Sequence, residues 1–439
     1  MKPYIPRSTI ASLALASATL SLLTQQSFAS GVNSGSSLTH GPAANPFSLY
    51  SATYNPAMNS LIIDEEKSYR MNYFPGFALS LELGKVDNFA DDLDELIDII
   101  DDPDSTDEDP SDVLERFNTV LSEMGDEGYI KTNIRARAPF LPFYFKKDGI
   151  GDFSLDFSLG AEISLSVLDD VLSYNDDIEN FVTNTSIYVK SGIEQTLSLG
   201  YSRAIGNEDN GLYFGSKLNL INLELSKQVT MLQDLDGREV DEVIENEYDR
   251  NLVSTSALGL DLGLIWTNHK YLVGLTLLNA NSPSFDYGEV GNNCGDLDPG
   301  SAELNSCDIT RYFIGRGDLK GAETHTKHAR LRTDGSIFVT DNWVASGSVD
   351  LAAYDDIVGF ENQWLHLSTS YESKTFWWPS LRAGYQKNLT GTELSSLTGG
   401  FTLLNCLTFD LEYGLESITV DGSSGPRRFG FAFGVEQKF

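Results

Sequence analysis

The chain has 439 residues and is strongly acidic, with 30 Lys and Arg against 64 Asp and Glu and a formal net charge of −34. Phosphate binding needs a basic surface, so this balance excludes a nucleic-acid partner. An acidic exterior suits solubility, cation-rich surroundings or a basic partner.

The first 29 residues have the three parts of a secretory signal peptide. Lys2 and Arg7 supply positive charge, and an uncharged run of apolar and small residues follows from Ile10 to Leu23. Ser27-Phe28-Ala29 then offers the small residues that a signal peptidase reads. We therefore predict export and cleavage after Ala29. The apolar run is shorter than the about 20 residues of a membrane-spanning helix, which disfavours an uncleaved anchor.

Period-2 alternation dominates the chain after residue 66. In the longest example, Phe153 to Val167, apolar residues at odd positions alternate with Ser, Asp, Gly and Glu at even positions. Ordinary strands have about 5–6 residues, whereas a strand with one lipid face and one lumen face requires long, strict alternation. No later segment approaches a membrane-spanning helix, which leaves a soluble periplasmic protein or a barrel. The alternation favours an all-β, antiparallel outer-membrane β-barrel.

We predict about fourteen strands, and the lengths of their connections provide an independent check. Bacterial barrels have short periplasmic turns and longer outside loops. Counting back from a periplasmic C-terminus places every short connection on the periplasmic side and every long one outside. The first two strands fit least well, because Pro75, Pro139 and Pro142 interrupt them. The predicted strands are 67–83, 129–146, 152–168, 186–204, 211–228, 250–266, 271–279, 326–340, 343–354, 362–373, 377–388, 396–404, 407–418 and 428–439.

The first long connection, 84–128, has helical rather than strand spacing. Two runs, one beginning at Phe89 and one at Val113, repeat apolar residues every three or four positions. We predict a helical hairpin whose apolar stripes pack on each other or on the barrel. From Asp87 to Glu127 only Arg116 is basic, against seventeen acidic residues. The insertion is either a solvated acidic cap or a docking site for a basic partner or divalent cations.

Two later loops carry further signals. Asp236-Gly237 within 229–249 favours a tight turn that extends a barrel hairpin. Cys294 and Cys307 lie in one stretch of the long loop 280–325, and the periplasm is oxidising, so a disulfide between them is plausible. Cys406 is expected within a strand, as a small buried apolar side chain. The cysteine spacing matches no zinc pattern.

Little in the sequence indicates catalysis or a cofactor. His366 and Ser368 are two apart, as the catalytic His and Ser are in outer-membrane phospholipases, but Leu365 and Leu367 form the apolar face of this strand. His366 and Ser368 should then face the lumen, away from a lipid substrate. No nucleophile elbow, phosphate-binding loop or dinucleotide fingerprint stands in a suitable context. We predict that the chain is not an enzyme and binds no cofactor or metal.

The chain resembles two known patterns. Its last strand, with Phe431, Phe433, Val435 and a terminal Phe439, resembles the signal read by the outer-membrane assembly machinery. The segment Asn45–Met58, with Asn-Pro-Ala at its end, resembles the opening of TraF-like conjugal-transfer proteins, which belong to the group of the FadL-type fatty-acid transporters. Leu278–Pro283, Ser380–Tyr385 and Thr398–Gly400 resemble the same family. The resemblance implies a barrel over 67–439, preceded by a plug-like or lead-in segment at 30–66.

Two functions remain open for a barrel in the cell outer membrane. The first is a binding or assembly role, in which the acidic outside loops contact a cell surface or a conjugation or secretion apparatus. This role predicts a blocked lumen and loss of partner contact when 84–128 is deleted. The second is passive transport of hydrophobic small molecules, as in FadL-type proteins, which predicts an apolar lumenal pocket and a bound lipid. Outer-membrane lipid surrounds the barrel in both.

Overall fold

The computed structural model describes residues 32–63, 67–101, 106, 108–177, 179–205, 211–234, 251–292, 294–420 and 422–436. Three sequence predictions lie outside these residues: the signal peptide with its cleavage site after Ala29, the turn at Asp236-Gly237, and the role of Phe439.

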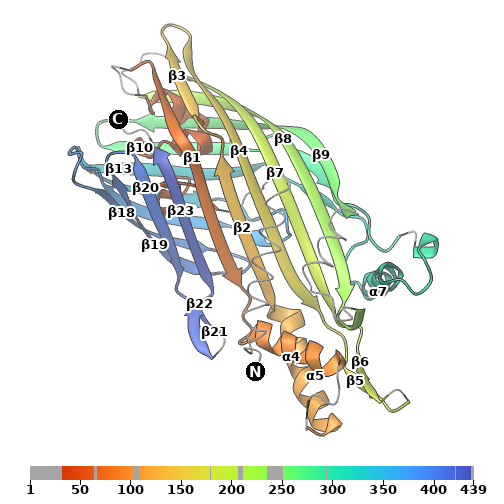
Figure 1. Cartoon of the computed structure of the whole chain (residues 1–439). Helices are drawn as coiled ribbons and strands as arrows, with labels where there is room; N and C mark the ends of the chain where they lie inside the picture. Colours follow the sequence, from red (N-terminus) through yellow and green to blue (C-terminus); the bar gives the residue numbers. More distant parts are fainter. Residues whose placement is uncertain are drawn as a thin grey trace.

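One antiparallel sheet closes on itself to form the barrel (Figure 1). Except for β2 and β3, each wall strand pairs with the next one along the chain, and β1 also pairs with the last strand, β23. β2 and β3 follow one another between β1 and β4, so fifteen strands fill fourteen positions, which confirms the predicted fold. The wall strands are β1 Tyr69–Leu83, β2 Tyr129–Arg137, β3 Phe143–Lys147, β4 Gly151–Leu168, β7 Ser186–Ala204, β8 Leu212–Met231, β9 Val253–Thr267, β10 Tyr271–Leu278, β13 Arg330–Thr340, β14 Trp343–Asp350, β17 Trp364–Tyr371, β18 Ser380–Asn388, β19 Ser395–Leu403, β20 Leu407–Gly414 and β23 Arg428–Glu436.

The predicted second strand, 129–146, is broken in the structure. Residues 138–142, which include Pro139 and Pro142, separate β2 from β3. Proline has no backbone N–H to donate to a ladder, so the pairing stops here and resumes beyond it. Pro75, by contrast, lies inside β1, where the pairing with β23 shifts register between Asn72 and Phe77.

Connections sort by length to the two ends of the barrel with one exception, because 389–394, among the long ones, has six residues and is shorter than 205–211 and 372–379 at the opposite end. Short turns lie at one end, which we name the turn end, and the long connections lie at the other, the loop end. One turn is longer than predicted, because β17 ends at Tyr371 and β18 begins only at Ser380. Pro379 cannot donate to the ladder, and the exposed Trp377 and Trp378 lie in this turn.

Alternation along the strands separates an apolar outer face from a polar lumen. In β8, Leu218 and Leu220 are 45% and 49% exposed, whereas Asn219 between them is 6% exposed. The same contrast recurs around the wall, as a lipid-facing surface requires. Exposed apolar side chains include Leu197, Leu199, Leu258, Val273, Leu275, Ile337, Leu367, Leu381, Leu397, Phe401, Phe409, Leu411 and Phe429.

The insertion 84–128 forms the predicted pair of helices, α4 Phe89–Asp101 and α5 Pro110–Glu127, which we name the cap (Figure 1). Its apolar stripes share one cluster with the ends of β4 and β7. β4 and β7 have 18 and 19 residues, whereas about 9–11 suffice to cross a bilayer. The cap therefore packs on wall that continues beyond the membrane. No helix of the described ranges is both long and apolar enough to span a membrane.

The connection 279–329, which we name the mouth loop, folds over the loop end of the lumen. It holds the hairpin of β11 Ser284–Asp286 with β12 Thr324–Thr326, the 3-10 turn Cys294–Asp296 and helix α7 Ala302–Arg316. Phe285 packs with lumenal residues of β8, and Phe313 of α7 packs beside Val229. Short hairpins also order three other long connections: β5 Ser173–Asn175 with β6 Asn180–Val182, β15 Tyr354–Asp355 with β16 Glu361–Asn362, and β21 Ser417–Val420 with β22 Ser423–Pro426.

Candidate functional site

Residues 32–63 lie inside the barrel and form a plug. They include α2 Ser37–His40, α3 Ser51–Tyr54 and the 3-10 helix η1 Pro56–Ser60. α2 contacts β17 to β20, whereas η1 contacts β4 and β7 to β9. The plug therefore crosses the lumen from one side of the wall to the other, which favours the plug-like alternative for this segment.

Hydrogen bonds tie the plug to distant wall strands. The backbone N–H and hydroxyl of Ser36 donate to Glu436 at 2.7 and 2.8 Å. The backbone N–H of Ala44 donates to Asp334 at 3.0 Å, and Lys217 donates to the carbonyl of Thr53 at 2.5 Å. The plug is rich in buried polar residues, and such groups are stable away from water only when they are hydrogen-bonded. Wall side chains supply some of those partners, and the plug itself supplies others, as where Ser51 donates to the carbonyl of Asn45 at 2.6 Å.

Paired charges line the lumen wall above the plug. Their carboxylates and cations come mostly from neighbouring strands, because residues on the lumenal face of adjacent strands lie opposite one another. Breaking such a buried pair leaves an uncompensated charge, so the pairs hold the wall in one register. They are Lys131 with Glu162 and Asp356, Arg137 with Asp156, Lys217 with Asp261, Lys327 with Glu194, Arg332 with Asp350, Arg382 with Asp410, and Arg428 with Glu82 and Glu412.

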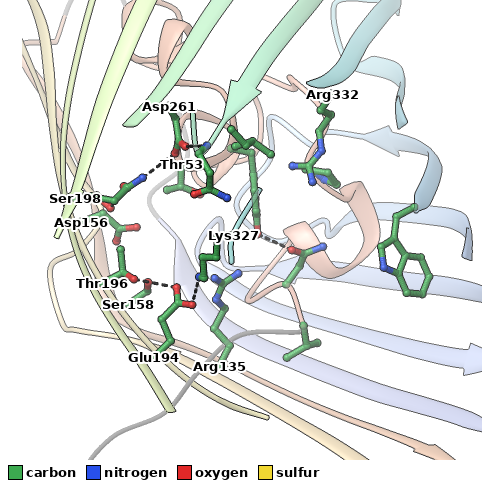
Figure 2. Close-up of a pocket in the computed structure, with 18 of the residues that line it drawn as sticks. Thr53, Arg135, Asp156, Ser158, Glu194, Thr196, Ser198, Asp261, Lys327 and Arg332 are labelled. Atoms are coloured by element: carbon green, nitrogen blue, oxygen red, sulfur yellow. Dashed lines mark hydrogen bonds and ion pairs between the residues drawn. The ribbon is translucent and has the colours of Figure 1, made fainter. Parts of the chain in front are cut away.

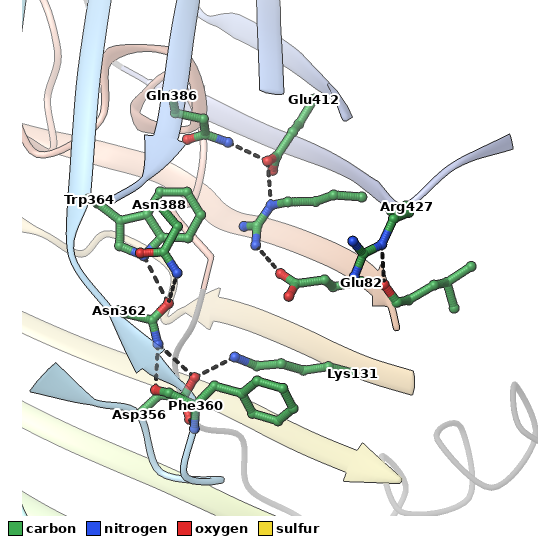
Figure 3. Close-up of polar contacts among 12 residues, drawn as sticks. Glu82, Lys131, Asp356, Phe360, Asn362, Trp364, Gln386, Asn388, Glu412 and Arg427 are labelled. Carbon is green, nitrogen blue, oxygen red and sulfur yellow. Dashed lines mark hydrogen bonds and ion pairs between the residues drawn. The ribbon is translucent and has the colours of Figure 1, made fainter. Parts of the chain in front are cut away.

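Arg428 joins three wall strands in the most connected of these clusters (Figure 3). Its Nε donates to Glu412 at 2.5 Å and its Nη1 donates to Glu82 at 2.6 Å. In the same region Asp356, from the connection after β14, accepts from Lys131 and from the amide of Asn362. This connection is thereby bound to the wall on the far side of the barrel.

A cavity of about 240 Å³ remains between the plug and the mouth loop (Figure 2). Thr53 and Tyr54 of the plug line it, together with lumenal side chains of the wall. Its charged lining residues are Arg135, Arg137, Asp156, Glu194, Lys217, Asp261, Lys327, Arg330, Arg332, Glu412 and Arg428. Its apolar ones are Val32, Leu38, Pro42, Ile221, Leu278 and Trp364. A charged wall of this kind suits a polar ligand and opposes a greasy one.

The mouth loop contains a buried histidine, His325 of β12. Burial lowers the pKa of His325 from 6.5 to about 4, with Lys327 acting in the same direction and Glu194 and Asp356 against it. His325 is therefore neutral at pH 7. Because its folded pKa lies below the unfolded one, the unfolded segment takes up a proton first as the pH falls. Stability is then lost as the pH falls from 6.5 towards about 4.

Acidification is therefore expected to open the hairpin of β11 and β12. Its amides should be protected from hydrogen exchange at pH 7 and lose protection at pH 5, after correction for intrinsic exchange. His325→Gln should abolish this pH dependence, whereas His328→Gln, at an exposed position nearby, should keep it. Equal loss of protection in both variants would show that another group titrates.

The cap presents carboxylates to solvent. Arg116 is committed to its own helix pair, at 2.8 Å from Glu95 and 3.5 Å from Glu108. Exposed carboxylates on such a surface attract a positively charged partner at long range. Ten acidic residues of the insertion are exposed: Asp87, Glu95, Asp98, Glu108, Asp109, Asp112, Glu115, Glu123, Asp126 and Glu127. No group of three or more His, Cys, Asp or Glu that could hold a metal ion is found in the described part of the chain.

The structure joins Cys294 and Cys307 by a disulfide, which links the 3-10 turn of the mouth loop to α7. The sequence predicts Cys406 within a strand, but it lies in the turn before β20, where it is half-buried. The reason is that Leu404 and Asn405 adopt positive φ angles, which end β19 and form a tight turn.

The C-terminal aromatic residues lie on the outer face of β23. Phe431 contacts Phe77 of β1 and Phe433 contacts Phe409 of β20, with ring centroids 5.7 and 5.0 Å apart. Val435 pairs with Phe74 and Leu407 in the ladders. These contacts join the first strand to the last. Recognition of these residues by the assembly machinery stays a prediction.

His366 and Ser368 lie on the lumenal face of β17, the side that the alternation predicts. Both are buried, at 6% and 8% exposure, whereas Leu367 between them is 50% exposed. His366 lies beside Trp364 and lines the cavity. The pair is therefore turned away from the lipid-facing surface of the barrel.

Sequence reasoning missed α7, although its signals are present. Ser301 caps the helix by accepting from the backbone N–H of Leu304, and Gly317 ends it in a left-handed conformation. A capping serine followed sixteen positions later by glycine is a recognisable start and stop. The Gly, Asn and Asp residues that precede the helix, and its weak apolar stripe, favour a loop instead.

Comparison with known proteins gives one family and several similar structures. A family model described as "F plasmid transfer operon, TraF, protein" matches residues 52–350, and no curated protein matches the sequence. The toluene transporter TodX of P. putida has a TM-score of 0.46 and 11% identity, over 93% of this chain and 99% of that one. A FadL homologue of Pseudomonas aeruginosa has a TM-score of 0.42 and 13% identity, over 93% and 98%. At such values these structures carry no information on ligand or activity.

Proposed function

Because the chain belongs to the family of the TraF protein of the F plasmid transfer operon, we propose that it is an outer-membrane docking protein. In this role the acidic cap engages a basic partner, such as a component of a conjugation or secretion apparatus, and the barrel anchors the cap in the membrane. The role assigns no catalysis and no cofactor to the chain.

The proposal rests on one observation: the cap is a folded unit with its own core, and it stands on a barrel whose lumen holds the plug. A solvated acidic loop would need no core of its own, yet Leu96, Val113, Phe117 and Leu121 are at most 1% exposed. They pack onto wall strands that extend beyond the membrane. Burial of this kind holds the exposed carboxylates in a fixed arrangement, which favours recognition by a partner.

The lining of the cavity weighs against passive transport of hydrophobic molecules. An apolar ligand there would displace water from the paired charges and leave some of their hydrogen-bond donors and acceptors without partners. The plug contributes both apolar and polar side chains to the lining, Val32, Leu38 and Pro42 beside Asn33 and Thr53, so it is the charged wall that disfavours an apolar ligand.

Photo-cross-linking in living cells tests the docking role. A photoreactive residue at Thr119, exposed on α5, is expected to form cross-links with an envelope protein. Glu115→Lys together with Glu123→Lys should reduce these cross-links to background, because both positions are exposed on the same helix. The matched control, Asp148→Lys with Asp341→Lys, makes the same charge change at the turn end and should leave the yield unchanged.

Two results would count against the docking role. One is cross-linking from position 119 that survives reversal of the cap charges, in a protein that still migrates as a folded barrel. The other is an absence of cross-links combined with enrichment of one lipid class, relative to bulk membrane, in mass spectra of the purified protein. The second result would favour transport.

A further inference from the structure

The lumenal cavity has a feature that the docking role does not use, which is a local surplus of positive charge. Seven Lys and Arg line it. Five of them form ion pairs with carboxylates. The other two, Arg135 of β2 and Arg330 of β13, have no ion pair or hydrogen bond within the described ranges, and each has a buried Nε without a partner. In a chain with a net charge of −34, two half-buried cations with buried, unbonded N–H donors call for a ligand.

We propose that this cavity binds a small oxyanion, a molecule carrying carboxylate or phosphate groups, through the guanidinium groups of Arg135 and Arg330. A buried donor without an acceptor costs free energy, and a guanidinium presents its donors in a planar fork that matches both kinds of oxyanion. An oxyanion supplies the missing acceptors and the missing negative charge together.

The carboxylates nearest to the two arginines are already occupied. Glu194 accepts from Thr196 at 2.9 Å through one oxygen and from Lys327 through the other. Figure 2 shows Arg135 beside this pair rather than in place of Lys327. Both oxygens of Glu194 therefore have donors, and two cations lie near its single negative charge. The N–H donors of Arg135 remain available to a further anion.

Arg330 stands in the same relation to Asp350. One oxygen of Asp350 accepts from Arg332 at 2.8 Å and the other from the backbone N–H of Trp364 at 3.3 Å. The guanidinium of Arg330 instead lies 3.4 Å from the ring centroid of Tyr354. Stacking on an aromatic face fixes the plane of the guanidinium and leaves its in-plane N–H donors available. Nε and Nη1 of Arg330 are both buried without a partner.

The cavity has room for such a ligand. A cavity needs about 10–15 Å³ to hold a single water molecule. At about 240 Å³ this one holds a ligand of several atoms together with water. Two lining carboxylates, Asp156 and Glu412, each keep one oxygen without a hydrogen-bond donor. A hydroxyl on the ligand would donate to such an oxygen, so a hydroxylated anion should bind more tightly than a plain one.

Isothermal titration of the purified full-length barrel in detergent tests the site with three probes: succinate, malate and inorganic phosphate. Saturable binding of at least one probe is expected, with malate tighter than succinate if carboxylates are preferred. Arg135→Gln and Arg330→Gln should each weaken binding roughly tenfold or more, as the loss of a charge-assisted hydrogen bond implies. Arg311→Gln, at an exposed position of α7, should leave it unchanged.

The melting temperature without ligand separates binding from a structural role. Arg330→Gln removes a cation that has no ion pair in the described ranges and only its stacking on Tyr354, so the empty barrel should lose little melting temperature, whereas Arg332→Gln strands Asp350 and should melt much earlier. The proposal is wrong if no probe binds, if both Arg variants bind like the parent, or if Arg330→Gln destabilises the empty barrel as much as Arg332→Gln. None of these outcomes bears on the cap.

Discussion

Replacing Arg428 by Met is expected to destabilise the folded barrel by about 3–5 kcal/mol, the usual cost of removing one partner from a buried ion cluster. Arg428 is the shared partner of Glu82 and Glu412, which are 3% and 0% exposed. Methionine fills much of the same volume but leaves two carboxylates close together in the lumen without a cation. Tyr129 and Gln386 still donate to them, but neither carries charge.

Chemical unfolding in detergent micelles measures this effect as a shift of the midpoint at unchanged slope. Arg311→Met is the control, because Arg311 is exposed and its pairing with Asp308 is loose, at 3.7 Å; a change within about 0.5 kcal/mol is expected. Adding Glu82→Gln and Glu412→Gln to Arg428→Met should recover much of the loss. A midpoint for Arg428→Met equal to that of the control would show that the cluster contributes nothing.

Gly215→Val is expected to lift η1 of the plug away from the wall while leaving the barrel folded. A Cβ at Gly215 would stand 2.3 Å from the backbone N of Ala57 and from the carbonyl carbon of Pro56. Both atoms are backbone, so no side-chain rotation relieves the overlap, and overpacking of this kind costs about 1–3 kcal/mol. Valine itself suits a strand, which keeps the effect on β8 small.

Hydrogen exchange across the plug reads this displacement directly. Amides of 55–61, such as Met58, which donates to the carbonyl of Asn55 at 3.0 Å, should lose protection while those of the wall strands keep it. Gly399→Val introduces the same side chain in β19, where a Cβ meets nothing within 4 Å, and should change neither region. Full protection of 55–61 in Gly215→Val would contradict this prediction and show that η1 shifts enough to fit the valine while staying on the wall.

The wall could be predicted from the sequence because its constraint is local. A strand between lipid and water must alternate, so Phe153 to Val167 identifies β4 without knowledge of its neighbours. The helices of the cap follow for the same reason, since Phe89 and Leu93 repeat at helical spacing. The break between β2 and β3 is not predicted, because Pro139 and Pro142 only weaken the strand pattern in the sequence, whereas in the structure the backbone pairing ends there.

The interior could not be predicted in the same way, because its partners are distant. Alternation places Lys131 in the lumen but cannot tell that its partner is Asp356, 225 positions later in a loop. The plug has no period at all, and its Ser36 donates to Glu436, 400 positions later in the chain. Arg330 illustrates the limit, since an arginine without a partner is recognisable only after every neighbour has been placed.

The contact between Ser36 and Glu436 has a consequence for closure of the barrel. The two residues are 400 positions apart, and Glu436 lies at the end of the strand that seals the barrel against β1. The acceptor for Ser36 is therefore carried by the strand that closes the barrel. A chain without β23 would lack the closing strand and this acceptor together, so closure of the wall and seating of this end of the plug depend on the same nine residues.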